Sequence, residues 1–462
     1  MLDNNNWILT ADSYKVNHYL EIPDNIEYTY VTVVPRKPSK YTDKIVAMGH
    51  TLIADTLQEI RITQDMIDEA EIETKEQGFT FNRKGWEIIV NEFDGYLPLA
   101  MYGVKEGTVV KAQTPIMTFV NTDPRFAWLP GYIESWVQSI AWKMTTVASI
   151  CKKVRDTITD YCILTDTPVK YVDYMCHFFG DRAADSPQAA IMAGIAHAAL
   201  FNGSDCLQAN RYIKKLYHTN KSYLSSIEAT EHFVMMTNSE NKDDYAAAEM
   251  IVDRLCNTGN AFMSVVIDTY DSRRFVKEYI GTRLKDRILN AGGRLICRPD
   301  SNDPTIEPGL VGKDLEDTFG VTINKKGYKV LHPSVGVIQG DGIRIDTFES
   351  VLKGWIDAGF SMDNFALGMG SGISHDGARD DFSFSVKATA VYTDGKWKPL
   401  LKDPKTDPGK RSLSGLVKCD DNLETFVDTD TRGVGKNWKM WYHNVTKTFD
   451  QSFDEVRELA RK

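Results

Sequence analysis

Residues 294–301 have the sequence RLICRPDS, in which an apolar run stops abruptly at an arginine, a proline and an aspartate. Similar runs end the same way: VKYVDYMC leads into HFFGDR (169–182), MSVVID into TYD (263–271), VGVI into QGDG (335–342) and NFAL into GMGSG (364–372). The last four runs along the chain begin about 25 to 40 residues apart, which leaves room for a strand, a loop and a returning helix. This rhythm predicts βα units that form a parallel sheet or barrel.

The rest of the chain has a different pattern. The N-terminal third mixes short β patterns with a helical pattern over 128–154, and the βα rhythm stops after about residue 380. We therefore expect an α/β fold in which an irregular, TIM-like α/β barrel is inserted into a second α+β domain. The expected ranges are 1–166 for the first part of the α+β domain, 167–380 for the barrel and 381–462 for the returning part.

The composition is that of an ordinary folded protein. The 462 residues include 54 Lys and Arg against 64 Asp and Glu, a formal charge of −10, and 42% are hydrophobic. An acidic protein is a poor nucleic-acid binder, because that binding depends on clustered cations. The start lacks the features of a signal peptide, and the longest apolar stretch, AAIMAGIAHAALF (189–201), is too short to span a bilayer. Seven widely spaced cysteines without a C-x-x-C pair indicate reduced thiols, so we expect a cytoplasmic protein without membrane contact.

The predicted strand ends offer groups suited to a phosphorylated sugar beside an aromatic base. Arginine binds phosphate or carboxylate, and glycine lets backbone N–H groups approach an anion closely. Aspartate accepts hydrogen bonds from sugar hydroxyls or holds water around Mg²⁺, and Phe179 can stack on a flat ring. The groups are Arg182, Arg298, Arg379, Asp271, Asp300, Asp341, Gly340, Gly342, Gly368, Gly370 and Gly372.

Each of these residues also has an ordinary structural explanation. The glycine cluster GMGSG does not satisfy G-x-G-x-x-G and is compatible with a tight turn. Arg298 is compatible with a structural ion pair, Asp271 with the N-cap of a helix, and His232 with an exposed loop residue. Only their occurrence together on successive strand ends favours a functional site.

Several stretches, in order along nearly the whole chain, resemble those of the nicotinamide phosphoribosyltransferase family. They are TADSYKVNHY (10–19), HFFGDR (177–182), EATEH (228–232), VVIDTYD (265–271), ICRPDS (296–301), VIQGDGIRID (337–346), GMGSGI (368–373) and KDPKTDPGKRS (402–412). The resemblance implies a type II phosphoribosyltransferase, a homodimer whose active sites are shared between subunits. It implies a reaction of nicotinamide with 5-phosphoribosyl 1-pyrophosphate (PRPP) in the presence of Mg²⁺, giving nicotinamide mononucleotide and pyrophosphate.

The resemblance also implies roles for single residues. Phe179 and, from the other subunit, Tyr14 would cover the two faces of the pyridine ring, and Asp205 would accept a hydrogen bond from the carboxamide. Asp12 would contribute across the dimer. Arg182 would lie beside the ring and the pyrophosphate. Phosphate and ribose would be bound by Arg298, Asp300, Asp271, Gly340, Asp341, Gly370, Ser371, Arg379, Lys387, Lys402 and Lys410, with Mg²⁺ held mainly by pyrophosphate and water rather than by protein ligands.

His232 has a particular role in this family pattern. The matching histidine is phosphorylated by ATP, which couples ATP hydrolysis to product formation, and we expect Glu231 to orient His232. Within the catalytic group we place His232, Arg298 and Asp300. The resemblance therefore implies that ATP is a coupled substrate.

In the role that the resemblance implies, Asp205 is the best indication of which base is preferred. A carboxylate there attracts an amide donor and repels nicotinate, because two like charges about 4 Å apart cost roughly 4 kcal/mol at an effective dielectric near 20. Three residues depart from the family pattern, Ile267, Asp181 and Ser371, and Ile267 removes one polar group near the carboxamide.

Other functions remain open at this point. A nicotinate phosphoribosyltransferase shares the fold and the PRPP site, and a noncatalytic binding protein can be built on the same scaffold. An aldolase-like barrel is disfavoured, because no lysine ends an apolar strand.

Overall fold

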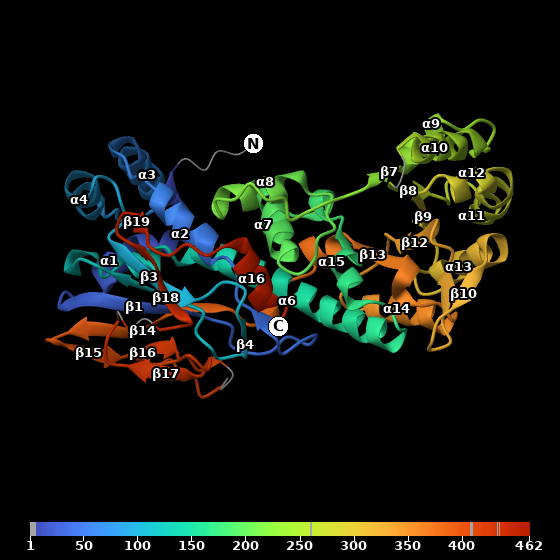
Figure 1. Ribbon diagram of the computed structural model, residues 1–462. Helices are drawn as coiled ribbons and strands as arrows, with labels where there is room; N and C mark the ends of the chain where they lie inside the picture. The colour runs from blue at the N-terminus through green and yellow to red at the C-terminus, as the bar shows by residue number, and fades with distance from the viewer. Residues whose placement is uncertain (1–5, 259–260, 407–409, 432, 434) are drawn as a thin grey trace. The chain divides into compact units, whose positions relative to one another are not determined.

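The computed structural model describes residues 6–258, 261–406, 410–431, 433 and 435–462 (Figure 1). By internal packing the chain divides into two units. Unit 1 comprises Met1–Ser149, Ile213–Thr219 and Ala378–Lys462, and unit 2 comprises Ile150–Tyr212 and Asn220–Gly377. The predicted domain borders at 166/167 and 380/381 stay predictions, since packing alone does not say where an independently folding domain ends.

Unit 2 is built on a six-stranded parallel sheet with the strand order β6-β13-β12-β9-β8-β7. Its strands are β6 Cys176–Phe178, β7 Glu228–Ala229, β8 Phe262–Val266, β9 Arg294–Arg298, β12 Val335–Gln339 and β13 Phe365–Met369. All neighbours are parallel, so every strand ends at the same edge of the sheet. The polar residues that follow the apolar runs are thereby gathered on one side.

The sheet closes on itself through a shorter wall. Isolated parallel bridges join Phe178 to Ser204 and Gly203 to Ser225, and Ser225 lies just before β7. The ring of strands is therefore complete, but between β6 and β7 single bridges replace a continuous ladder. This is the irregular barrel expected from the sequence.

Helices alternate with these strands, as βα units require. Ser186 caps the first of them, α7, by accepting a hydrogen bond from the backbone N–H of Ala189 at 3.1 Å. The helices are α7 Pro187–Ala198, α8 Leu207–Leu216, α9 His232–Thr237, α10 Tyr245–Thr258, α11 Ser272–Arg274, α12 Lys285–Asn290, α13 Glu307–Phe319, α14 Phe348–Asp357 and α15 Ser371–Ser374, with the π-helix η6 Phe275–Arg283 and the 3₁₀ turns η4 Val169–Tyr174, η5 Asp181–Ala183 and η7 Met362–Asn364. A hairpin of β10 Val321–Ile323 and β11 Lys329–Leu331 completes the unit. The long helix α6 Glu134–Leu164 and helix α8 contain borders between the two units.

Unit 1 is built on a seven-stranded antiparallel sheet with the strand order β15-β14-β1-β5-β3-β18-β19. Its strands are β1 Ile26–Val34, β3 Leu99–Val104, β5 Met117–Asn121, β14 Ser385–Thr393, β15 Lys396–Pro399, β18 Trp438–His443 and β19 Thr446–Lys447. Strands from the two ends of the chain pair with each other, β1 with β14 and β3 with β18. Both chain ends are thus needed to make one sheet.

Smaller elements surround this sheet. They are the hairpins β2 Ile45–Val46 with β4 Val109–Val110 and β16 Leu416–Cys419 with β17 Thr425–Asp428, the helices α1 His18–Glu21, α2 His50–Glu59, α3 Gln64–Glu76, α4 Arg83–Phe93, α5 Leu129–Tyr132 and α16 Phe453–Ala460, and the 3₁₀ turns η1 Trp7–Leu9, η2 Ser13–Asn17, η3 Pro124–Phe126 and η8 Arg379–Asp381. Their apolar side chains join those of the sheet in one core cluster that includes Tyr30, Phe119 and Trp441.

A buried carboxylate ties distant segments of unit 1 together. Glu106 is fully buried, and its carboxylate accepts hydrogen bonds from the backbone N–H of Gly49 at 2.6 Å, the hydroxyl of Thr51 at 2.5 Å and the hydroxyl of Tyr217 at 2.8 Å. Gln451 bonds to both the N–H and the carbonyl of Glu106. Segments more than 300 residues apart in sequence therefore meet at one side chain.

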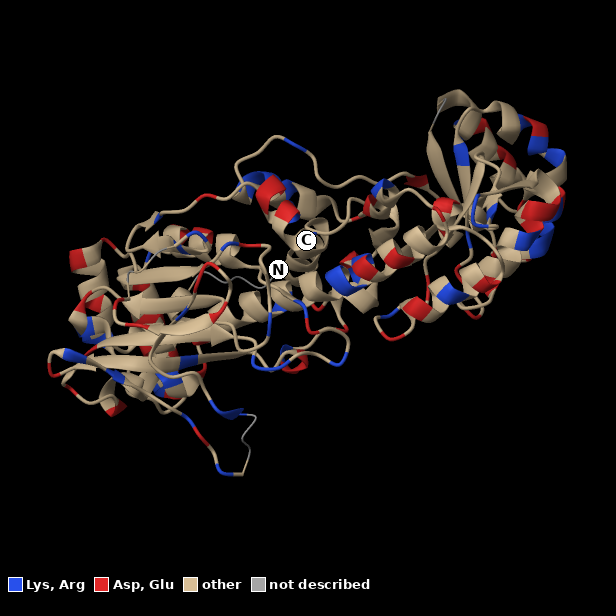
Figure 2. Cartoon of the chain, turned by 60° about the horizontal axis from the view of Figure 1, so that its bottom comes forward, with Lys and Arg blue, Asp and Glu red and all other residues tan. Residues whose placement is uncertain are grey.

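The expected α/β fold is confirmed: an irregular barrel accompanied by a second α+β unit built from both chain ends. Acidic and basic segments are interspersed over the chain, while the strands of the two sheets are mostly uncharged (Figure 2). Within the described ranges, no helix has both the length and the apolar character that crossing a membrane demands.

Candidate active site

Gly340, the residue that follows β12, is surrounded by three predicted site residues. A Cβ atom on Gly340 would lie 3.3 Å from Cδ of Arg298, 3.4 Å from Oδ1 of Asp300 and 3.5 Å from Cε2 of Phe179. These side chains follow or end β9 and β6, which share a parallel sheet with β12. The structure thus places the side chains of Arg298, Asp300 and Phe179 around the backbone of Gly340, which has no side chain of its own.

Phe179 lies against a second glycine. A Cβ atom on Gly368 of β13 would lie only 2.0 Å from Cε2 and 2.4 Å from Cδ2 of the Phe179 ring. The backbone N–H of Phe179 also donates to the carbonyl of Met369 at 2.9 Å. Gly368 is therefore required to be glycine by the position of the ring, rather than by a turn.

His232 begins helix α9 and faces two carboxylates. Its Nε2 lies 3.4 Å from Oδ1 of Asp268, and its Nδ1 lies 3.8 Å from Oδ2 of Asp300. The other oxygen of Asp268 accepts the backbone N–H of Asp300 at 2.8 Å, which joins the Asp268 carboxylate to the backbone after β9. Glu231, which we expected to orient His232, makes no hydrogen bond to it among the described residues; the carboxylates nearest to the ring are those of Asp268 and Asp300.

Arg298 is hydrogen-bonded to the protein through one end of its guanidinium group. One guanidinium nitrogen, Nη2, donates to the carbonyl of Thr230 at 2.9 Å, while Nε is buried without a hydrogen-bond partner in the described part of the chain. The hydroxyl of Thr230 accepts the N–H of Val266. An unpaired buried guanidinium N–H is costly, so an anion bound near it would satisfy a group that the fold leaves open.

Asp205 lies on the short wall of the barrel. Its backbone N–H donates to the carbonyl of Phe178 at 3.1 Å, and its Oδ1 accepts the hydroxyl of Ser226 at 2.6 Å. Burial lowers the pKa of the neighbouring His177, although the Asp205 charge and the carbonyl of Tyr174 oppose that effect. A neutral histidine next to a fixed carboxylate leaves the negative charge of Asp205 uncompensated.

A cavity of about 710 Å³ lies within unit 2, lined mainly by residues at the starts of the parallel strands, the edge opposite to the strand ends described above. Its walls include His177 and Ser226 together with apolar side chains of the parallel strands, among them Ile296, Ile338 and Ala366. Phe179, Asp205 and Arg298 are not among the residues that line it. It reaches Ser226, the hydrogen-bond partner of Asp205.

Other predicted residues of unit 2 stand apart from these contacts. Asp271 caps α11 by accepting the N–H groups of Arg273 and Arg274 at 3.0 Å, which is the N-cap role that the sequence also allowed. The side chains of Arg182 and Asp341 are exposed and have no protein partner within the described chain. Gly370 approaches the carbonyl of Phe179, and Ser371 opens the short helix α15.

Unit 1 carries the residues predicted to act across a dimer. The side chain of Tyr14 is 56% exposed, and its hydroxyl lies 3.5 Å from Oδ2 of Asp12, which also accepts the hydroxyl of Ser135 at 2.7 Å. Partial burial and the charges of Asp12 and Glu134 raise the pKa of Tyr14. Tyr14 is therefore an exposed, protonated aromatic ring at neutral pH.

A cluster of cations surrounds Lys387 on β14. Burial lowers the pKa of Lys387; Glu134 opposes this, whereas the positive charges of Lys402, Arg36 and Lys15 lower it further. The group therefore attracts anions. Arg379 instead pairs with Asp380 at 2.7 Å, and Lys410 directly follows residues 407–409, which lie outside the described residues.

Sequence reasoning missed three residues that these contacts bring forward. Asp268 comes directly after the apolar run that contains β8, and this position could have identified it. The prediction named Asp271, three residues later in the same motif, instead. Arg36 and Ser226 gave no signal, because each depends on a neighbour far away in sequence.

The sequence matches known proteins over most of its length. The pattern of the nicotinate phosphoribosyltransferase (NAPRTase) family matches residues 174–444, and that of the nicotinamide phosphoribosyltransferase N-terminal domain matches residues 6–101. A nicotinamide phosphoribosyltransferase of Xanthomonas campestris is 34% identical over 89% of this chain and 87% of its own length. One from Acinetobacter baylyi is 30% identical over 97% and 95% of the two chains.

Solved structures share the fold. A nicotinate-nucleotide pyrophosphorylase from Pyrococcus furiosus superposes with a TM-score of 0.61 at 14% identity, covering 100% of this chain and 96% of that one. Human nicotinic acid phosphoribosyltransferase superposes with a TM-score of 0.54 at 13% identity, covering 98% of this chain and 93% of that one. From the family match and the similarity to these relatives, the chain belongs to the nicotinate phosphoribosyltransferase (NAPRTase) family.

Proposed function

We propose that this protein joins nicotinamide to PRPP and releases nicotinamide mononucleotide and pyrophosphate. The observation that carries the choice of base is Asp205, a carboxylate fixed by the hydroxyl of Ser226 at 2.6 Å on the barrel wall next to Phe178. Curated relatives at 30–34% identity are named nicotinamide phosphoribosyltransferases, which supports the same reaction.

The chemistry is a displacement at ribose C1. The lone pair of the pyridine nitrogen forms the new C1–N bond while the bond from C1 to pyrophosphate breaks and its electrons leave with the pyrophosphate. Positive charge develops on the sugar and negative charge on the leaving group, so acceptors and cations are needed on opposite sides. Asp300 supplies an acceptor and Arg298 a cation within reach of Gly340. No general base is required, because nicotinamide has no proton on that nitrogen.

The base is selected by charge and stacking. Phe179, pressed against Gly368, offers a fixed face for the pyridine ring. Because Ser226 occupies one oxygen of Asp205, the other oxygen remains for the carboxamide N–H of nicotinamide. Nicotinate would place a second carboxylate at the same point, and the two like charges would repel each other.

ATP enters the proposal through His232. The histidine attacks the γ-phosphorus of ATP, an N–P bond forms, the bond to the β-phosphate oxygen breaks, and ADP leaves; later hydrolysis of the N–P bond returns the free histidine and phosphate. Oδ1 of Asp268, 3.4 Å from Nε2, supports this role, because a carboxylate this close stabilises the positive charge that develops on the ring as the N–P bond forms. The phosphorylated form adds negative charge next to Asp300.

Mg²⁺ fits the donor atoms at this edge of the sheet. Oδ1 of Asp268 is buried without a hydrogen bond among the described residues, and Oδ2 of Asp300 lies near the same histidine. Among the described residues no group of three His, Cys, Asp or Glu side chains is arranged to hold a metal alone. Asp268 and Asp300 would therefore share the ion with phosphate oxygens and water, where it supplies positive charge to the leaving pyrophosphate.

The exposed ring of Tyr14 and the cations around Lys387 support a shared site in a homodimer. The ring of Tyr14 is exposed beside Asp12. The positive charges of Lys402 and Arg36 lie close enough to Lys387 to lower its pKa, so this group of cations attracts phosphate. In the proposed dimer each subunit supplies these groups to the barrel of the other. The cysteines form no disulfide among the described residues, which supports a reducing, cytoplasmic setting.

The test is an assay of the purified protein with PRPP and Mg²⁺, with nicotinamide or nicotinate, with and without ATP. We expect nicotinamide mononucleotide and a kcat/KM for nicotinamide well above that for nicotinate. Asp205→Asn should narrow that ratio by at least about tenfold, because it removes the charge that repels nicotinate. The matched control is Asp160→Asn, an exposed aspartate of α6. A product formed from nicotinate alone would overturn the choice of base.

A further inference from the structure

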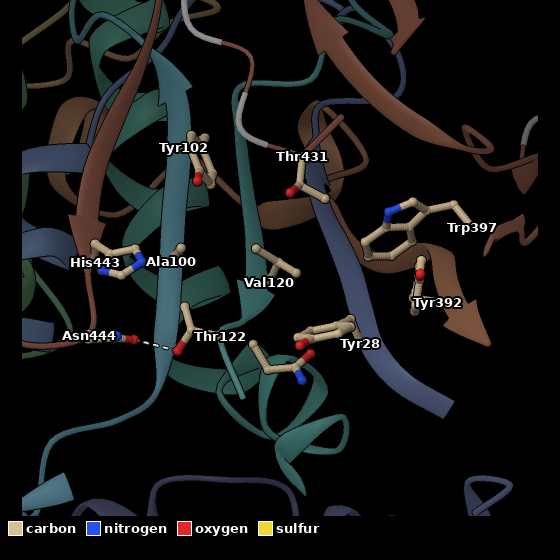
Figure 3. A pocket seen from close by; sticks show the side chains of 11 residues that line it. Tyr28, Ala100, Tyr102, Val120, Thr122, Tyr392, Trp397, Thr431, His443 and Asn444 are labelled. Atoms are coloured by element: carbon tan, nitrogen blue, oxygen red, sulfur yellow. Dashed lines mark hydrogen bonds between the residues drawn. The ribbon is translucent and has the colours of Figure 1, made fainter. Parts of the chain in front are cut away.

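A second cavity, of about 440 Å³, lies entirely within unit 1 on one face of the antiparallel sheet. Its residues come from six strands and the turns beside them: Tyr28, Ala100, Tyr102, Val120, Asn121, Thr122, Tyr392, Trp397, Thr431, His443 and Asn444. Figure 3 shows that Tyr28, Tyr392 and Trp397 form one wall, that His443 and Asn444 face them, and that Val120 lies between. The proposed reaction uses none of these residues.

The strand register explains why the face is hollow. Tyr28 is paired with Tyr392, and Tyr392 with Trp397, so large rings stand in one row across the sheet. Ala100 is paired with both Val120 and His443, which puts small side chains in the middle of the same face. Large residues at one side and small residues in the centre leave a space between the two walls.

The aromatic wall is ordered before any ligand arrives. The rings of Tyr28 and Tyr392 have centroids 5.8 Å apart at 72°, and those of Tyr392 and Trp397 are 5.5 Å apart at 67°. All three rings remain partly exposed. Preordered aromatic side chains of this kind favour the binding of a flat ring, since little side-chain freedom is lost.

The opposite wall offers hydrogen bonds from a fixed amide. The hydroxyl of Thr122 donates to the side-chain oxygen of Asn444, which sets the orientation of the amide. Among the described residues the NH₂ group of Asn444 and the indole N–H of Trp397 then have no protein acceptor. These two lining residues therefore carry donors that the described chain leaves to water or a ligand.

Charge excludes several ligand classes. Among the described residues, those that line the cavity include no Lys, Arg, Asp or Glu. A phosphate or carboxylate buried there would find no fixed partner of opposite charge. An uncharged ring carrying a hydrogen-bonding edge has both the required shape and the required chemistry.

We propose that this cavity binds an uncharged heteroaromatic ring whose edge carries a hydrogen-bond acceptor, a carbonyl oxygen or a ring nitrogen, the chemistry shared by nucleosides and by pyridine carboxamides. The ring lies against Tyr28, Tyr392 and Trp397, and its polar edge accepts from Asn444. The site is separate from the barrel residues of the proposed reaction.

Nuclear magnetic resonance of the full chain tests this proposal through the indole N–H of Trp397, identified as the resonance absent from Trp397→Leu. The probes are adenosine and nicotinamide, with AMP and nicotinate as charged counterparts. We expect at least one uncharged probe to shift this resonance saturably, and its charged counterpart to shift it about tenfold more weakly or not at all. A response to adenosine alone identifies a nucleoside site, and one to nicotinamide alone a pyridine carboxamide site.

Asn444→Gly is the decisive variant. Asn444 has φ 55°, a conformation that glycine adopts readily, so the change removes the amide and keeps the turn. It should weaken the shift about tenfold, whereas Asn241→Gly, at φ 54° outside the cavity, should not. The remaining indole resonances report that each variant is folded. No shift with either uncharged probe, an equal shift in Asn444→Gly, or an equal response to the charged probes would overturn the proposal.

Discussion

Nε2 of His232 lies 3.4 Å from Oδ1 of Asp268, an oxygen that is buried and makes no hydrogen bond among the described residues. Oδ2 of the same carboxylate holds the backbone of Asp300 at 2.8 Å. Asp268 thus connects the histidine proposed to react with ATP to the strand end proposed to bind ribose. A change at Asp268 should affect both.

Asp268→Asn should slow phosphorylation of His232 about 10- to 100-fold, because it removes a negative charge 3.4 Å from the ring that becomes positively charged as the N–P bond forms. The measurement is incorporation of label from γ-phosphate-labelled ATP, beside the ratio of product formed with and without ATP. Glu231→Gln serves as the control, since Glu231 does not bond to His232. Equal labelling of Asp268→Asn and the unmodified protein would exclude this role for Asp268.

Gly368→Ala should raise the KM for nicotinamide about tenfold and leave the KM for PRPP nearly unchanged. The new Cβ would lie 2.0 Å from Cε2 of Phe179, so the ring must move out of its stacking position. Gly336→Ala on β12 is the matched control, because its nearest neighbour would be 3.2 Å away. Steady-state kinetics with each substrate varied in turn give both constants, and a PRPP defect of equal size would point to general damage to the barrel.

Lys387→Met should raise the melting temperature at neutral pH while raising the KM for PRPP about tenfold. Burial and the nearby cations lower the pKa of Lys387, so the folded chain binds this proton more weakly than the unfolded chain does. Below its pKa in the folded protein, Lys387 is charged and destabilises the fold by the full amount. This destabilisation disappears as the pH rises toward the ordinary lysine pKa near 10.5.

The melting temperatures of Lys387→Met and the unmodified protein should therefore converge at alkaline pH. Lys398→Met, an exposed change on the neighbouring strand β15, should show neither effect. A variant that is less stable at neutral pH would contradict the assigned cause of the pKa shift.

Glu106→Gln should lower the free energy of unfolding by about 1–3 kcal/mol. The amide that replaces the carboxylate brings an NH₂ group to a site where Gly49, Thr51 and Tyr217 all donate, so a buried donor loses its acceptor. Thermal unfolding followed by circular dichroism measures the loss. The exposed Glu73→Gln in α3 should change stability little, and a Glu106→Gln protein as stable as that control would show that the network contributes no net stability.

Much of the barrel could be predicted from the sequence, because each strand is a short apolar run with a polar stop. Arg298, Asp300 and Gly340 were expected at strand ends, and they meet around the Gly340 backbone. Parallel pairing makes this possible, since residues at equal positions after successive strands share one edge.

Residues that act through distant partners could not be predicted in this way. Ser226 matters through its bond to Asp205 across the short wall, and Arg36 through its charge beside Lys387. The sequence positions of Ser226 and Arg36 do not indicate that Asp205 and Lys387 are their partners. Asp271 shows the opposite case, since its position after a strand suggested a ligand whereas its carboxylate is occupied by the N-terminus of α11.

The short wall of the barrel, where single bridges link Phe178 to Ser204 and Gly203 to Ser225, has a consequence for hydrogen exchange and for evolution. Amide protons there are shielded by isolated bonds rather than by a ladder, so they should exchange with solvent before those of β9 and β12. Asp205 lies in this locally labile wall. The residue proposed to select the base can therefore be altered by insertion or substitution with less effect on the ends of β9 and β12, which are proposed to bind phosphate and ribose.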